Sequence, residues 1–156
     1  MESIPSWRST TRTKGIDMKL SNNNAIAIVN ILAGMKLNRI ADTDVRTNLV
    51  WNYVELRRVS KIADDKRTEI VRKFQEDWAD EIDDVRNQRS ENKPVTGHDS
   101  FLESERLANE LIATIYNEEV EVSIRPVGMD ELVGVLSGDD ITFEQVAFLA
   151  DNGIVK

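Results

Sequence analysis

The longest stretch without a helix breaker is the feature that most limits how this chain folds. Residues 43–90 contain neither glycine nor proline, and their apolar side chains recur mostly three or four positions apart, which places them on one stripe of an α-helix. Unbroken, this helix would be roughly 70 Å long at about 1.5 Å per residue. The rest of a 156-residue chain is too short to cover it. The helix therefore either breaks near residues 60–66, or another copy or a partner covers its exposed stripe.

A loop and a second helix follow the long stretch. Residues 91–99 contain Pro94 and Gly97, which predict a loop. Ser100 and Glu103 are spaced as in a capping box, which predicts that a helix begins there. Its expected apolar face consists of Leu102, Leu107, Leu111, Ile112, Ile115 and Tyr116. Because the loop allows this helix to fold back, the sequence predicts a long antiparallel helical hairpin over about residues 43–118.

The beginning of the chain differs from the remainder. Residues 1–17 carry three basic side chains, lack helical or strand periodicity and predict an extended arm. The arm is either a natural extension, for example one that ties into a neighbouring subunit, or an added segment. A short strand is expected near Met18–Leu20, then a helix that Asn22 or Asn23 caps and Gly34 ends.

The end of the chain predicts a strand followed by two helices. Residues 119–127 alternate apolar and polar side chains up to Pro126, which is typical of a strand. One strand is not stable alone, so we expect it to pair with the strand near Met18–Leu20. A short helix and a last helix, capped by Thr142, complete a single domain over residues 18–156. The predicted fold is mainly α with a minor two-stranded β-sheet (α+β).

The charge of the chain limits its partners. A net charge of −8 disfavours binding to phosphate backbones, which is driven by Lys and Arg, so direct nucleic-acid binding is not expected. A basic partner fits better. The chain has no cysteine, which excludes disulfides and thiolate metal sites. Its longest apolar run, residues 25–33, is shorter than the about 20 residues that cross a bilayer, so we expect no membrane partner.

The densest acidic cluster lies within residues 75–86. Its carboxylates share a helix face, which makes a candidate acidic face that imitates the phosphates of a nucleic acid: Glu76, Asp77, Asp80, Glu81, Asp83 and Asp84. Carboxylate oxygens are the ligands that Mg²⁺ and Ca²⁺ prefer, but one helix face does not surround an ion. The favoured interpretation is a solvated face with a local ion pair between Asp83 and Arg86. We therefore predict no metal site.

Residues suited to catalysis are scarce. His98 is the only histidine, which excludes sites that need two imidazoles, and the glycines form no phosphate-binding pattern. A Ser-His-Asp set from Ser100, His98 and Asp99 is disfavoured because adjacency in sequence does not supply the geometry. We expect no catalytic residues and no cofactor.

Basic side chains surround the corner before the long helix. Lys36, Arg39, Arg46, Arg57 and Arg58 lie near Trp51 and Tyr53, and basic residues beside aromatic ones can bind nucleic acid. On an acidic chain, ordinary salt bridges and a packed tryptophan are the favoured interpretation.

Two segments carry a resemblance to a known family. Through residues 22–62 and 117–154, the chain resembles, over most of residues 18–154, a family of small, functionally uncharacterised proteins of tailed bacteriophages and prophages. The similar residues of the first segment are Asn30, Leu32, Gly34, Lys36, Leu37 and Arg46. The arm before Met18 and the lack of a Ser-Arg pair at the corner depart from the family pattern. The family implies no activity, but it implies a phage setting, in the bacterial host cytoplasm or in the virion.

These observations favour a non-catalytic phage-type protein for protein interaction or virion assembly. It would self-associate or bind a protein partner through an apolar stripe on the long helix, the candidate interface of Phe74, Trp78, Ile82 and Val85. The alternative is a phage inhibitor of a host protein, in the form of an acidic nucleic-acid mimic. An enzyme of unknown type is the third hypothesis.

Overall fold

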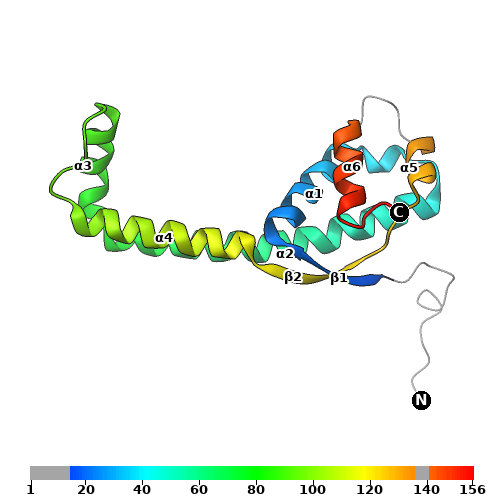
Figure 1. Ribbon diagram of the computed structural model, residues 1–156, viewed down its shortest axis with the longest axis horizontal. Coiled ribbons are helices and arrows are strands. Elements are labelled where there is room, and N and C mark those ends of the chain that lie inside the picture. The colour runs from blue at the N-terminus through cyan, green and yellow to red at the C-terminus, as the bar shows by residue number, and fades with distance from the viewer. Residues whose placement is uncertain (1–14, 136–140) are drawn as a thin grey trace, which may run out of the picture. The chain divides into compact units, whose positions relative to one another are not determined.

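The computed structural model describes residues 15–135 and 141–156. Their contacts cluster in two compact units. Unit 1 comprises the described residues up to Ser60 and from Glu119 onward, and unit 2 comprises Lys61–Glu118. Helices dominate both, with one two-stranded sheet (Figure 1), which confirms the predicted mainly α fold with a minor sheet. That residues 18–156 form one domain stays a prediction.

The sheet of unit 1 joins two strands that are far apart in the sequence. Strand β1, Ile16–Ser21, pairs antiparallel with strand β2, Glu119–Ile124, from Ile16 opposite Ile124 to Ser21 opposite Glu119. The predicted pairing is confirmed. β1 begins earlier than expected, because it extends as far as its partner offers backbone groups. Ile16 and Asp17, which were predicted to belong to the extended arm, are therefore part of β1. Residues 1–14 of the predicted arm lie outside the described part of the chain.

Helix α1, Asn22–Gly34, follows β1 directly. The Oγ of Ser21 accepts a hydrogen bond from the backbone N–H of Asn24 at 3.1 Å, so Ser21 caps the helix. The expected cap at Asn22 or Asn23 is wrong, because both residues already belong to the first turn. Gly34 is the last helical residue rather than the cap, which is Met35. The positive φ at this corner belongs to Lys36, ahead of the short 3₁₀ helix η1, Leu37–Arg39.

Apolar side chains from all the elements of unit 1 form its core. Helix α5, Met129–Val135, and helix α6, Phe143–Asp151, complete this unit. Thr142 caps α6 as predicted, in a capping box with Gln145. The core residues with the largest fully buried side chains include Ile28, Leu32, Met35, Leu49, Leu56, Ile124, Leu132, Leu149 and Ile154. Burial of this apolar surface is the main term that stabilises unit 1.

Helix α2, Thr43–Asp77, runs without interruption through residues 60–66, so of the two alternatives the break near these residues is wrong. Asp42 caps the helix, since its Oδ1 accepts hydrogen bonds from the N–H groups of Asp44 and Val45. The helix ends instead beside Trp78, which has φ −120° and ψ 22°. Helix α3, Ala79–Ser90, starts directly after it. No glycine or proline marks this break in the sequence.

Helix α4, Asp99–Asn117, completes unit 2. It begins after His98, so Ser100 lies in the first turn and the predicted capping box is wrong. The Tyr116 hydroxyl donates to Oδ1 of Asp64 at 3.0 Å, and the Phe74 and Phe101 rings are 5.1 Å apart. Asp64 lies before Phe74 on α2, whereas its partner Tyr116 lies after Phe101 on α4. Within unit 2, α4 therefore lies antiparallel to the last part of α2, which confirms a helical hairpin (Figure 1).

Candidate functional site

An aromatic cluster holds the helices of unit 2 together. Phe101 of α4 is buried, and its ring lies 5.1 Å from that of Phe74 on α2 at an interplanar angle of 59°. The Trp78 ring meets Phe101 edge to face, 5.8 Å away at 86°. Tilted and edge-to-face pairs at these distances are favourable geometries for aromatic rings. The residue at the break of the long helix therefore contacts the residue that anchors α4.

Two of the four predicted interface residues, Phe74 and Trp78, belong to this cluster. Val85 is buried, whereas Phe74, Trp78 and Ile82 are half-buried. Phe74 and Trp78 pack on Phe101 of the same chain, and Ile82 and Val85 line a groove with Phe74 and Phe101, so the four residues do not form a bare helix stripe. Much of their apolar surface thus contributes to the core of unit 2.

A groove remains beside the aromatic cluster. It has a volume of about 310 Å³ and lies between α2, α3 and α4. Its walls are mainly apolar: Ile70, Val71, Phe74, Ile82, Val85, Phe101, Ala108 and Ile112. Polar side chains of Gln75, Arg86, Arg89, Glu105 and Asn109 also line it. A concave, largely apolar surface with a few polar groups is the usual form of a binding site.

Two arginines at this groove differ in how they are paired. Arg89 donates to both carboxylate oxygens of Glu105, at 2.9 and 2.6 Å, a bidentate pair between α3 and α4. The hydrogen bond from Arg89 lowers the pKa of Glu105. Arg86 has a longer contact, 3.4 Å to Asp83 on its own helix, and 72% of its side chain is exposed. Arg86 therefore offers a cation that its neighbour holds only weakly.

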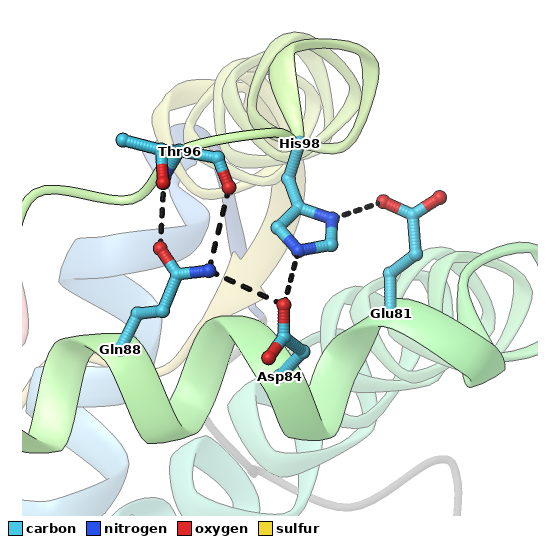
Figure 2. Close-up of polar contacts among 5 residues, drawn as sticks. All are labelled: Glu81, Asp84, Gln88, Thr96 and His98. Atoms are coloured by element: carbon cyan, nitrogen blue, oxygen red, sulfur yellow. Dashed lines mark hydrogen bonds and ion pairs between the residues drawn. The ribbon is translucent and has the colours of Figure 1, made fainter.

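His98 fastens the loop before α4 to α3. Its Nδ1 lies 2.7 Å from Oε2 of Glu81 and its Nε2 lies 2.5 Å from Oδ2 of Asp84, as Figure 2 shows. A neutral imidazole carries one N–H, so it donates to only one carboxylate, whereas the charged form donates to both. The hydrogen bond to Asp84 and then that to Glu81 raise the pKa of His98. This arrangement favours an imidazolium ion.

Gln88 holds the same loop at a second point. The Gln88 Nε2 donates to the carbonyl oxygen of Thr96 at 3.3 Å, and the backbone N–H of Thr96 donates to Oε1 of Gln88 at 2.8 Å (Figure 2). The same Nε2 also contacts Asp84 at 3.2 Å. With the hydrogen bond from His98, this contact lowers the pKa of Asp84. One carboxylate thus links both fastening points.

The predicted acidic face is divided and largely paired. The break at Trp78 separates Glu76 and Asp77 on α2 from the other four carboxylates on α3. Glu76 pairs with Arg72, and Asp83 pairs with Arg86 as predicted. Glu81 and Asp84 pair with His98, and only Asp77 and Asp80 of the six lack an ion pair within the described chain. The six carboxylates therefore do not form one continuous face of negative charge.

The basic corner of the sequence lies in unit 1 and is partly paired. Arg46 donates to the carbonyl oxygen of Ile40 at 2.9 Å, and Arg58 pairs with Glu55. The Trp51 indole donates to the carbonyl oxygen of Ser123 at 3.3 Å. The guanidinium of Arg125 lies over the Trp51 ring, 3.8 Å from its centroid. The favoured interpretation, salt bridges with a packed tryptophan, agrees with these contacts, although Trp51 keeps 40% of its surface exposed.

Two contacts were not foreseen from the sequence. The His98 contacts join a loop to a helix, and the only local signal is the spacing of Glu81 and Asp84 by one helical turn. The Arg125 contact with Trp51 joins α2 to the segment after β2. Neither pair is adjacent in sequence, so one sequence alone shows no link between them.

We found no matching family model, no matching curated protein and no matching solved structure for this chain. Among residues 15–135 and 141–156, no group of three or more His, Cys, Asp or Glu side chains is arranged to hold a metal ion. None of the helices described is both long and apolar enough to cross a membrane.

Proposed function

We propose that this chain is a non-catalytic protein-interaction protein of a phage type that serves virion assembly, and that it binds its protein partner through the groove of unit 2. The observation that carries this proposal is the apolar groove beside Phe74 and Phe101. The phage setting is supported by the resemblance of residues 22–62 and 117–154 to the phage family.

Several features of the groove suit a protein partner. Its walls come from three helices that the aromatic cluster and the Arg89–Glu105 pair hold together, and a preformed site loses less entropy when a partner binds. Aromatic and arginine side chains, which are enriched at protein interfaces, occur together here in Phe74, Phe101 and Arg86. The groove therefore combines an apolar anchor site with a charged rim.

Light scattering over a concentration series, at low and high salt, tests the proposal. The variant Ala108→Trp fills the groove from its α4 wall, and Ala113→Trp adds the same side chain to the exposed part of the same helix. We expect self-association of the wild type and of Ala113→Trp that Ala108→Trp weakens. Association that Ala108→Trp leaves unchanged would contradict a role for the groove.

If the protein stays monomeric, the same three proteins serve as baits in a host lysate. A protein that the wild type and Ala113→Trp retain, and that Ala108→Trp does not, would support the groove as a partner site. No difference among the three baits would overturn the proposal.

An inhibitor of a host protein is the second candidate function. The observation that favours it is the charge of unit 2, since residues 61–118 hold fifteen acidic side chains against nine Lys and Arg. The pairing of Glu76, Glu81, Asp83 and Asp84 reduces the resemblance to a row of phosphates. Such a complex with a basic host protein should weaken steeply as salt rises. A complex that is insensitive to salt would count against the mimic.

A further inference from the structure

Phe143 is an unusual apolar side chain on the surface of unit 1. It is 95% exposed, more than any other large apolar side chain of the described chain. It is the first residue of α6, and the capping box of Thr142 and Gln145 fixes the helix start that presents it. An exposed aromatic side chain on an ordered helix end resembles the anchor residues of protein interfaces.

The groove of unit 2 has the size and lining to receive such a side chain. Its volume of about 310 Å³ exceeds that of a phenyl ring, and the Phe74 and Phe101 rings are part of its wall. A third ring placed there can adopt the offset or edge-to-face geometry that aromatic pairs prefer. The exposed Phe143 side chain, called the knob below, and the groove are thus both apolar and aromatic.

The charges beside the two features are opposite. Glu144 follows Phe143 and is exposed in the first turn of α6. Arg86 lines the groove, is largely exposed and has only the 3.4 Å contact to Asp83. A phenylalanine that enters the groove therefore brings a carboxylate toward a weakly held guanidinium.

We propose that Phe143 of one copy inserts into the groove of unit 2 of a second copy, with Glu144 near Arg86 of that copy. This inference rests on the proposed function and names the partner of the same groove. The knob and the groove are different surfaces, so the contact is heterologous, and each copy can give one knob and receive another. Copies then join head to tail. A contact of this small size is weak, so it should form at high protein concentration.

Single substitutions test the knob. Phe143→Ala should weaken self-association and raise its dissociation constant about tenfold or more without loss of helix content, because the side chain makes little contact with its own chain. Leu111→Ala is the matched control, since Leu111 is a 57% exposed apolar side chain on the outer part of α4. Weakening by Leu111→Ala but not by Phe143→Ala would overturn the inference and assign the interface to α4.

Mixing two defective variants tests the head-to-tail geometry. Phe143→Ala retains the groove, and Ala108→Trp retains the knob. Each alone should stay monomeric, whereas an equimolar mixture should form a one-to-one dimer and nothing larger. A mixture that stays monomeric overturns the inference. Should Ala108→Trp alter the circular dichroism spectrum, Arg86→Glu replaces it, and Glu144→Lys should then restore binding to Arg86→Glu.

The results separate the two proposals. If Ala108→Trp abolishes association and Phe143→Ala does not, the groove binds something other than Phe143. The proposed function then stands and the inference about Phe143 fails. If neither variant changes association, both fail. A wild-type monomer at all concentrations overturns the inference and leaves the proposed function to the lysate experiment.

Discussion

The Nε2 of His98 lies 2.5 Å from Oδ2 of Asp84, while the other ring nitrogen of the same imidazole faces Glu81. Only 14% of the His98 side chain is exposed. Because one imidazole contacts two carboxylates, the attachment of the loop before α4 to α3 depends on whether His98 is protonated. That dependence can be measured.

Stability should depend on pH through His98. Its folded pKa lies above its ordinary value of 6.5, so its contribution is complete below about pH 6.5 and is lost as pH rises through the raised value. The pKa of Asp84 is lowered from 3.8, so its contribution is present above that value and is lost as pH falls through the lowered one. We expect His98→Gln to reduce the free energy of unfolding more at about pH 5.5 than at about pH 9, as measured by urea unfolding.

The control for this experiment is Asp83→Asn, which changes an exposed carboxylate of the same helix that pairs with Arg86 instead. Its effect should not follow the titration of His98. An equal loss of stability for His98→Gln at both pH values would show that the imidazole is not charged in the folded protein.

Phe101 should be the most sensitive position of unit 2. It is 3% exposed and contacts both Phe74 and Trp78, so Phe101→Ala should cost about 3–5 kcal/mol. Hydrogen exchange should then increase in residues 61–118 and change less in unit 1. Leu107→Ala, on the same helix but 47% exposed, should cost about 0.5 kcal/mol or less. Similar losses from both variants would argue against the described packing of α4.

The Arg89–Glu105 pair should show a modest coupling. The two side chains are 48% and 29% exposed, so solvent screens the bidentate contact in part. A double-mutant cycle with Arg89→Ala and Glu105→Ala should give about 0.5–1 kcal/mol, and 1 M salt should lower this value. Zero coupling at low salt would mean that the pair does not hold α3 to α4.

Asn52 should be essential to unit 1. Its side chain is fully buried, its Nδ2 donates to the carbonyl oxygen of Arg125 at 2.8 Å, and its Oδ1 accepts from the Arg125 N–H at 2.7 Å. Asn52→Ala leaves both backbone groups without these partners, at a cost of about 1–3 kcal/mol. Thermal unfolding measures this loss. Asn30→Ala, an exposed position of α1, is the matched control and should change the unfolding temperature little.

The sequence predicted the helices and the two strands because each depends on a local pattern, and it predicted the pairing of the strands because one strand is not stable alone. Apolar spacing marks a helix and alternation marks a strand, whatever they pack against. The sequence did not predict the end of α2 beside Trp78, a residue that contacts Phe101 more than twenty positions further along the chain. Tertiary contacts of this kind leave no local signal.

The sequence predicted four residues of the candidate site but not how they are arranged. The sequence did not show that Phe101 would pack against Phe74 and Trp78, or that Ile82 and Val85 would line a groove beside Phe101. The exposed positions of Leu107 and Leu111 also differ from the expected apolar face, because α4 packs within unit 2 through a narrower stripe than its sequence suggests.

The hydrogen bond between Asp64 and Tyr116 bears on the order in which the chain folds. Pairing of Ile16 with Ile124 closes a loop of more than one hundred residues, and longer loops cost more entropy to close. Residues 61–118 form a hairpin of more local contacts, and contacts close in sequence tend to form faster. The Asp64–Tyr116 contact brings the entry and exit of that hairpin together. A hairpin that forms first shortens the search by which β1 finds β2, so variants that loosen unit 2 should also slow the folding of unit 1.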